Sequence, residues 1–171
     1  MALELRALNA TDADEYRRVR LNALQMEPSA YSSSYETALE QPRSFFINRA
    51  SFKPDNFLFG AWDAASLIGM AGGYVDPELK RQHIGHVVSV WVEPEYRRQG
   101  LARQLTMLVM DQLQSLQQVT QIQLVATAGN QAAISLYEGF GFQAWGEEPR
   151  SIRVNDDYYN DIHMYLNLSP D

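Results

Sequence analysis

Several residues that could bind a phosphate follow one another in the run Arg97-Arg98-Gln99-Gly100-Leu101-Ala102. A glycine lets a ligand approach the backbone closely, and the first N–H groups of a helix, at the positive end of its dipole, form an anion site. The run lacks the GxxxxGKS/T and GxGxxG patterns, so it is neither a P-loop nor a dinucleotide fingerprint. Taken alone, it predicts either a phosphate site or an ordinary strand-to-helix turn with surface arginines.

The histidines and the absence of cysteine narrow the chemistry further. The three histidines, His83, His86 and His163, have no metal-binding spacing, and no metal is expected. Without cysteine there is no thiol nucleophile, no disulfide and no cysteine-bound zinc, a composition that fits a reducing cytoplasm. His86 is either a catalytic base with a pKa near 6.5 or a hydrogen-bonded residue of a strand.

Composition and charge set the class of protein. With 171 residues, 46% of them hydrophobic and 20% charged, the chain predicts one globular domain over residues 1–168 and a short tail over 169–171. The net charge of -7 argues against a nucleic-acid partner and favours a cationic small substrate. Residues 1–8 alternate in character and no run of about 18 apolar residues occurs, so neither a signal peptide nor a membrane partner is expected.

The elements that must position these residues alternate between strands and helices. Period-two or apolar runs predict strands over residues 3–6, 57–62, 67–75, 84–92, 121–127, 140–147 and 158–168. Helical spacing predicts a helix from a Thr11–Asp14 capping box to Pro28, one or two short helices over 33–49, a long helix over 101–116 and another over 129–138. The phosphate run therefore joins a strand to the long helix.

Three motifs together resemble the GCN5-related N-acetyltransferase (GNAT) superfamily. Its signature R/Q-x-x-G-x-G/A is matched by Arg97, Gly100 and Ala102, and the preceding V-x-V-x-P by Val90, Val92 and Pro94. The downstream part of the pattern is matched by Asn130, Ala133, Leu136, Tyr137, Gly141 and Phe142. The resemblance implies an α/β fold, with a mixed sheet of about seven strands splayed between strands 4 and 5 and about four flanking helices.

The same resemblance implies acetyl-CoA as co-substrate, an amine as acceptor and a homodimer. Main-chain groups of Val90, Trp91 and Val92 are then expected along the pantetheine arm. The pyrophosphate would lie on the turn formed by Arg97, Arg98, Gln99, Gly100, Leu101, Ala102 and Arg103, while Asn130, Ala133 and Tyr137 face the cofactor from the next helix. On an ideal helix Asn130 and Tyr137 share a face to within about 20°.

Catalytic roles also follow from the resemblance. Tyr137 corresponds to the general acid, because a phenol with a pKa of about 10 can reprotonate a thiolate whose conjugate acid has a pKa near 8.5. The N–H of Val90 corresponds to the oxyanion donor. His86 stands where some members carry a catalytic glutamate, and either His86 or an ordered water is the base. Tyr137 can alternatively be a packed core aromatic.

The acceptor and the acyl group stay open. Tyr31, Tyr35, Tyr158 and Tyr159 are candidate acceptor contacts through cation–π interactions, or packing residues. The acidic residues Glu147, Glu148, Asp156, Asp157 and Asp161 form either a solvated face or an attractor for a cationic amine. The leading function is acetyl transfer to a primary amine by direct attack in a ternary complex. The alternatives are a non-catalytic acyl-CoA-binding module and a transferase that uses a longer acyl-CoA.

Overall fold

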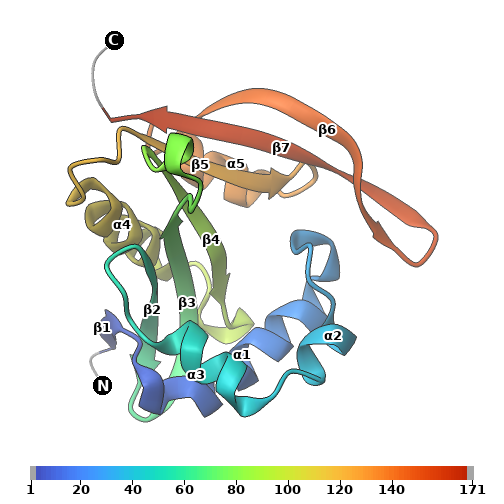
Figure 1. Cartoon of the computed structure of the whole chain (residues 1–171). Helices are drawn as coiled ribbons and strands as arrows, with labels where there is room; N and C mark the ends of the chain where they lie inside the picture. The colour runs from blue at the N-terminus through green and yellow to red at the C-terminus, as the bar shows by residue number, and fades with distance from the viewer. Residues whose placement is uncertain (1–2, 169–171) are drawn as a thin grey trace.

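The apolar runs pair into one mixed sheet in the computed structural model, which describes residues 3–168 (Figure 1). The order across the sheet is β1-β2-β3-β4-β5-β7-β6. Its strands are β1 (Glu4–Ala7), β2 (Asn56–Asp63), β3 (Ser66–Val75), β4 (Ile84–Val92), β5 (Gln121–Thr127), β6 (Gln143–Val154) and β7 (Asp157–Asn167). The mixed seven-stranded sheet is confirmed, and the predicted tail over residues 169–171 lies outside the described residues.

The parallel pair β4–β5 separates soon after it forms. Residues of β4 pair with β5 only over Ile84, Gly85 and His86, whereas every other neighbouring pair is antiparallel and longer. Ser89 has a φ of 57°, and the register of β4 against β3 shifts there. Such a bulge bends its strand. The two strands diverge in Figure 1, as the predicted splay requires.

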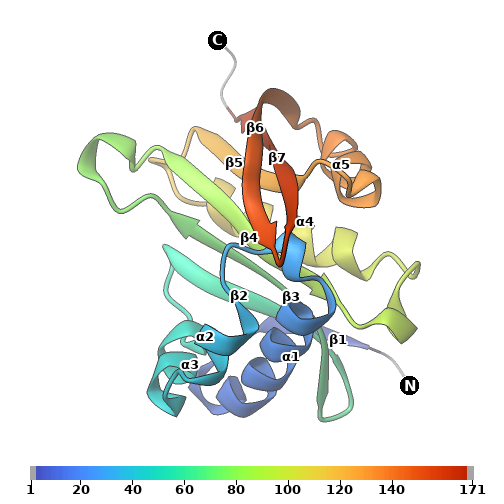
Figure 2. The same cartoon turned by 90° about the vertical axis from the view of Figure 1, so that its right-hand side faces the viewer.

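Helices cover both faces of the sheet, as Figure 2 shows. They are α1 (Ala13–Met26), α2 (Tyr35–Leu39), α3 (Arg43–Ala50), α4 (Leu101–Gln114) and α5 (Gln131–Glu138). On one face α1 and α3 bury Tyr16, Val19 and Phe46 against Leu58, Met70 and Trp91 of the sheet. On the other face α4 buries Leu101, Leu105, Val109 and Leu113 against Phe57, Val87 and Ile122. Pro42 separates α2 from α3, as its fixed φ and missing N–H predict.

Several predicted boundaries shift, and two of them shift enough to change the local structure. The capping box at the first helix is formed by Asn9 and Asp12 instead of Thr11 and Asp14, because a 3₁₀ turn, Ala10–Asp12, precedes α1. The strand predicted to end at residue 147 continues to Val154, so the expected loop before the last strand is a hairpin arm with its turn after Val154. Residues 147–150, Glu-Glu-Pro-Arg, are all exposed and interrupt the apolar pattern, so the sequence predicts that the strand ends there.

Candidate active site

The start of α4 has the geometry of an anion cradle. Arg98 and Gly100 have φ angles of 62° and 77°, so the chain turns sharply before the helix. Gly100 is the N-cap and supplies no side-chain cap, and the bond from the Gln104 N–H to the Gly100 carbonyl (3.0 Å) closes the first turn. The N–H groups of the three residues between them therefore have no acceptor within the helix, and they can bind an anion.

A groove of about 240 Å³ lies on this turn. Predicted cofactor residues form most of its wall, which consists of Val92, Tyr96, Arg97, Arg98, Gly100, Leu101, Ala102, Arg103, Ala132 and Leu136. No acidic side chain stands in the first turn of α4. A pyrophosphate would fit this groove, because free N–H donors and the side chains of Arg98 and Arg103 surround it. Gln99, which was also predicted to bind the cofactor, does not line the groove.

Arg97 holds this turn in place instead of offering a free charge. Its Nε donates to the carbonyl of Val92 at 2.9 Å, and its Nη2 lies 3.0 Å from the carboxylate of Glu27. The guanidinium also stacks over the ring of Trp91 at 4.7 Å. Trp91 itself is buried on the far face of the sheet, so only its main chain is available to a cofactor. Arg97 thus ties the end of β4 to the end of α1.

A second, larger cavity of about 600 Å³ opens where β4 and β5 separate. It brings together the predicted residues His86, Val90, Asn130, Ala133, Tyr137 and Tyr31. Helix α5 forms a wall of both hollows, with Ala132 and Leu136 on the groove and Ala133 and Tyr137 on the cavity. One extended ligand can therefore run from the groove along α5 into the splay.

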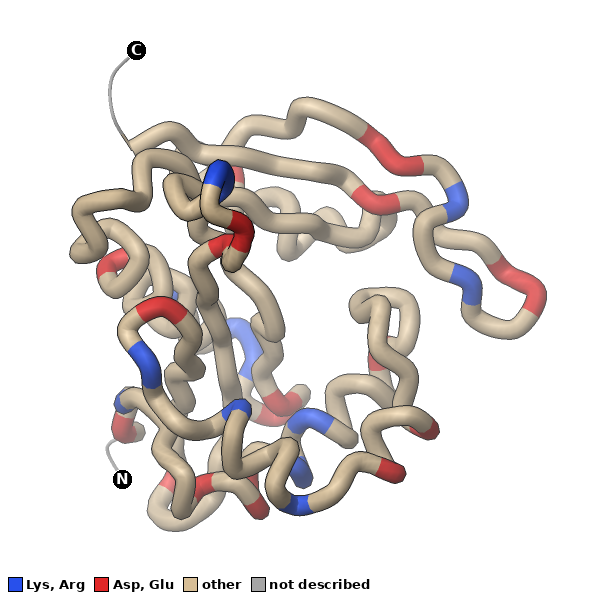
Figure 3. The backbone as a smooth tube through the Cα atoms, viewed as in Figure 1, with Lys and Arg blue, Asp and Glu red and all other residues tan. Residues whose placement is uncertain are grey.

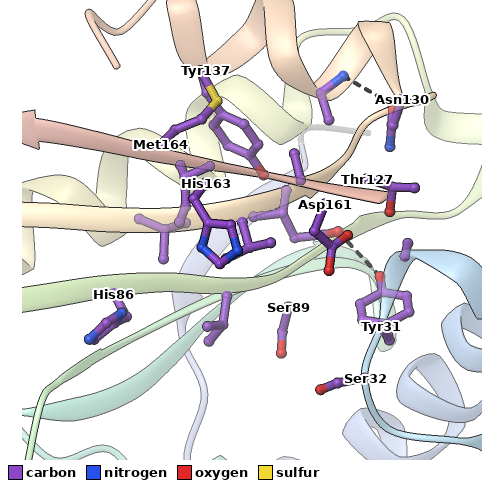
Figure 4. Close-up of a pocket in the computed structure, with 18 of the residues that line it drawn as sticks. Tyr31, Ser32, His86, Ser89, Thr127, Asn130, Tyr137, Asp161, His163 and Met164 are labelled. Atoms are coloured by element: carbon purple, nitrogen blue, oxygen red, sulfur yellow. Dashed lines mark hydrogen bonds between the residues drawn. The ribbon is translucent and has the colours of Figure 1, made fainter. Parts of the chain in front are cut away.

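The structure shows Tyr137 as a packed core aromatic whose hydroxyl also reaches the cavity. The residue is only 7% exposed and packs edge-on against Phe142, with ring centroids 6.1 Å apart. Its hydroxyl nevertheless points into the cavity, as Figure 4 shows, and forms no hydrogen bond within residues 3–168. Burial raises the pKa of Tyr137 to about 12, so the phenol keeps its proton at neutral pH. Its hydroxyl can therefore donate a hydrogen bond to a basic atom that enters the cavity.

The segment after α1 closes the open end of the splay. The hydroxyl of Tyr31 donates to the Val90 carbonyl at 3.3 Å, drawn as a dashed line in Figure 4. Two residues earlier, the Ser29 carbonyl accepts a hydrogen bond of 2.9 Å from the Thr127 hydroxyl at the end of β5. Asn130, at the start of α5, uses its side-chain oxygen to cap the helix through the Ala133 N–H at 3.1 Å. Both walls of the cavity are thereby fixed.

His86 sits on β4 within a small polar cluster. Its Nε2 lies 3.3 Å from Oδ2 of Asp76, and Tyr74 stacks on the imidazole with centroids 4.6 Å apart. Burial lowers the pKa of His86, although the bond to Asp76 opposes that effect. The pKa of Asp76 is lowered chiefly by its hydrogen bond from Arg81. His86 is therefore neutral at neutral pH, and it lines the cavity as a base would.

The candidate acceptor tyrosines lie in different places. Tyr31 lines the cavity, whereas Tyr35 packs beside Leu21 and Leu24, outside the lining that the described residues form. Tyr158 is 44% exposed on the hairpin arm, where Arg150 lies 3.7 Å above its ring, and Tyr159 pairs with Ile152 beside it. An acceptor role for these three stays a prediction that requires a ligand reaching beyond the cavity.

Sequence reasoning missed several residues that line the cavity. For Asp161 the sequence leaves a solvated face and an attractor for a cationic amine open, and the structure places it only 9% exposed and facing the cavity from β7. Arg20 and Thr127 also line it, from α1 and β5. Their side chains meet only through tertiary folding, so no local spacing could have indicated them.

Charge, hydrophobicity and the arrangement of His, Asp and Glu add three observations on residues 3–168. Figure 3 shows Lys and Arg positions distributed among Asp and Glu positions along the fold. None of the helices in residues 3–168 has the length and apolar composition of a bilayer-spanning helix. The same residues contain no group of three or more His, Asp or Glu side chains arranged to hold a metal ion.

Known proteins resemble this chain in sequence and in fold. The sequence profile of the acetyltransferase (GNAT) family matches residues 20–142. The N-terminal acetyltransferase B complex catalytic subunit NAA20 of Arabidopsis thaliana is 33% identical over 99 residues, which are 58% of this chain and 56% of that protein. The chain thus matches little more than half the length of that curated relative.

Solved structures share the fold over nearly their whole length. A GNAT-family acetyltransferase from Streptococcus pneumoniae superposes with a TM-score of 0.82 at 22% identity, covering 97% of this chain and 99% of that one. The Salmonella typhimurium protein yncA, solved with its cofactor acetyl-CoA, superposes with a TM-score of 0.80 at 14% identity and covers 100% and 96% of the two chains. The predicted fold class is confirmed.

Proposed function

Because this chain belongs to the acetyltransferase (GNAT) family, we propose that it transfers an acetyl group from acetyl-CoA to a primary amine. One observation carries the proposal: α5 lines both the anion groove at Gly100 and the cavity lined by Tyr137 and Val90. An extended co-substrate with a pyrophosphate in the groove would present its thioester in the splay between β4 and β5.

Different residues of this chain would bind different parts of acetyl-CoA. The free N–H groups at the start of α4, with Arg98 and Arg103 beside them, would hold the pyrophosphate. Main-chain groups of β4 beyond His86 have no partner in β5, and those of Val90, Trp91 and Val92 would pair with the pantetheine arm. The small side chain of Ala133 leaves room for that arm against α5.

The reaction is direct attack in a ternary complex. The amine nitrogen forms a bond to the thioester carbonyl carbon, the carbon–sulfur bond breaks, and the CoA thiolate takes a proton from the Tyr137 hydroxyl. The Tyr137 phenolate regains a proton from solvent before the next turnover. The N–H of Val90 would stabilise the negative charge on the carbonyl oxygen during attack. The proton lost by the amine passes to His86 or to water. The absence of cysteine is consistent with a route that has no acyl-enzyme on a thiol.

Thiol release tests the proposal. Acetyl-CoA is incubated with the protein and separately with polyamines, amino acids, aminoglycosides and peptides with free N-termini, and the freed CoA thiol and acetylated amine are both measured. We expect acceptor-dependent release for at least one class. Binding of acetyl-CoA with no release for any amine would instead identify a non-catalytic acyl-CoA-binding module, and competing acyl-CoA chain lengths in the same assay would reveal a preference for a longer acyl group.

Initial rates then test direct attack. With both substrates varied, a ternary complex predicts double-reciprocal lines that intersect. Parallel lines would indicate an acyl-enzyme intermediate and would contradict the proposed route.

A further inference from the structure

Arg20 is a cation without an anionic partner on the wall of the larger cavity. It projects from α1, and its guanidinium carbon lies 4.7 Å from the centre of the Tyr31 ring. Its Nη1 atom is buried and has no hydrogen-bond acceptor, and the guanidinium forms no ion pair within residues 3–168. Desolvating part of an unpaired guanidinium costs stability, which a bound anion would restore.

Charged residues of α1 and of its C-terminal end are already paired. On the same helix Arg18 binds Glu15 and Glu93, at 2.9 and 3.2 Å. Glu27 also lines the cavity, but its carboxylate lies 3.0 Å from Arg97. The fold therefore leaves Arg20 unpaired, although acidic residues stand nearby in the sequence.

Asp161 presents the complementary charge from the opposite wall. The residue is 9% exposed, its carboxylate accepts a hydrogen bond of 2.6 Å from the Ser151 hydroxyl, and it takes part in none of the ion pairs that residues 3–168 form. Asp161 pairs with Thr127 across the β5–β7 register, and Thr127 bonds to Ser29 beside Tyr31. These contacts place Asp161 and Arg20 at the same end of the cavity, on β7 and α1 respectively.

We propose that the amine acceptor is a small zwitterion, whose carboxylate binds Arg20 and whose ammonium is drawn in by Asp161. This inference rests on the proposed acetyl transfer and names the acceptor class as free amino acids. A guanidinium matches the planar carboxylate with two parallel hydrogen bonds, and one cation balances one negative charge, whereas a phosphate monoester carries nearly two at neutral pH. The ammonium gives its proton to the base or to solvent before the neutral amine attacks.

The same arrangement disfavours purely cationic acceptors. A polyamine would be attracted by the net charge of -7, but its second ammonium would face Arg20 at short range. Like charges in a partly desolvated cavity repel more strongly than they do in water. The local charges thus select against the class of substrate that the overall charge favours.

Matched acceptors test the role of the carboxylate. Each standard α-amino acid is compared with its α-amide and with its decarboxylated amine, and spermidine serves as the cationic reference. For the best amino acid we expect kcat/KM to exceed that of its amide on the order of 10- to 100-fold. The ammonium of an amino-acid amide loses its proton more readily than that of the free amino acid. Amine basicity alone would therefore favour the amide, against the preference that we expect.

Variants at two positions of α1 assign the effect to Arg20. Arg20→Gln should reduce the acid-to-amide ratio to near one, and Arg20→Lys should restore part of it, because lysine keeps the charge without the planar fork. Arg17→Gln is the matched control, since Arg17 stacks on Phe46 and bonds to the Leu39 carbonyl, away from the cavity. Far-ultraviolet circular dichroism and thermal melts check that each variant folds.

Three results would overturn the inference. Wild-type preference for amides or spermidine, or an acid-to-amide ratio that Arg20→Gln leaves unchanged, contradicts it while acetyl transfer stands. If no amine is acetylated, the proposed function fails. Calorimetric titration with the same pairs of amino acid and amide then tests whether Arg20 binds a carboxylate. Carboxylate-dependent binding that is lost in Arg20→Gln supports the site, and its absence in the wild-type protein refutes it.

Discussion

Burial acts in opposite senses on two titratable side chains of the larger cavity. It raises the pKa of the Tyr137 phenol to about 12, and it lowers the pKa of the His86 imidazole. In each case desolvation disfavours the charged form. At neutral pH the cavity therefore holds a protonated phenol and a neutral imidazole, which are the states required of an acid and a base.

The pH profile tests the part played by His86. Since its pKa lies below 6.5, the neutral form dominates above that pH, and kcat/KM should fall as the pH drops through the His86 pKa. His86→Gln should remove that acid limb. Asp76→Asn should move it to lower pH, because the bond to Asp76 raises the His86 pKa. An acid limb that persists unchanged in His86→Gln would assign the base to water.

At the residue scale, the sequence revealed groups that belong to a local motif and missed those that tertiary contacts assemble. Val90, Gly100 and Tyr137 could be identified because each falls within a run of fixed spacing. Asp76 and Arg20 could not be identified in this way, because their proposed roles depend on tertiary contacts. Asp76 meets His86 across the β3–β4 hairpin, and Arg20 reaches a cavity formed by elements far along the chain.

We propose that the start of α4 is the element on which cofactor binding depends. Gly100→Glu should lower acetyl-CoA affinity on the order of 100-fold or more, because a carboxylate would stand beside the pyrophosphate and a left-handed φ of 77° is strained for any other residue. Gly100→Ala isolates the strain and should cost about 1 kcal/mol of stability. Calorimetric titration measures the affinity, and wild-type affinity in Gly100→Glu would refute the cradle.

Asp12, the residue before α1, anchors the start of that helix. Asp12 accepts two hydrogen bonds from Arg6, at 2.7 and 2.9 Å, and one from the Asn9 N–H at 2.9 Å. Asp12→Ala should lower the free energy of unfolding by about 2 kcal/mol in urea titration. Asp14→Ala is the control, because its pair with Arg43 is exposed and should leave the midpoint unchanged.

The same aspartate gives the stability a defined dependence on pH. Arg6 lowers the pKa of Asp12 in the folded chain, chiefly through their hydrogen bonds. Its contribution is therefore complete above the ordinary pKa of about 3.8 and is lost as the pH falls through the folded-state value. The difference between wild type and Asp12→Ala should shrink in that range. A constant difference would contradict the assigned interaction.

Elements were predictable where burial gives the sequence a period. β4 and β5 have the bounds that were predicted, because β-branched and apolar residues fill them and turn residues end them. The far half of β6 was not predictable, since residues 147–150 are exposed and lack an apolar period while the strand still pairs with β7 on both sides of a bulge. The first helix cap shifted because Asn9 competes successfully with Thr11 for the turn.

At the scale of the whole molecule, one sheet joins residues 4–167 and carries a helical layer on each face. This supports the proposal that residues 1–168 form a single domain. The splay between β4 and β5 lies at the centre of that sheet, so a ligand bound there contacts both halves. Cofactor binding should consequently stabilise the entire fold.

Thermal unfolding measures that coupling. Acetyl-CoA at 100 times its Kd should add about 2.7 kcal/mol of stability, which corresponds to roughly 5–10 °C in Tm for a chain of 171 residues. Adenosine, which lacks the pyrophosphate and the pantetheine arm, should give no comparable shift. An unchanged Tm at every acetyl-CoA concentration would contradict cofactor binding to the folded chain.

The most direct test of the account is the turnover of Tyr137→Phe at known cofactor occupancy. The substitution keeps the ring against Phe142 and removes only the hydroxyl that points into the cavity. We predict that kcat falls on the order of 100- to 10,000-fold while the Kd for acetyl-CoA stays unchanged. Wild-type kcat in Tyr137→Phe would contradict the assignment of Tyr137 as the proton donor to the leaving thiolate.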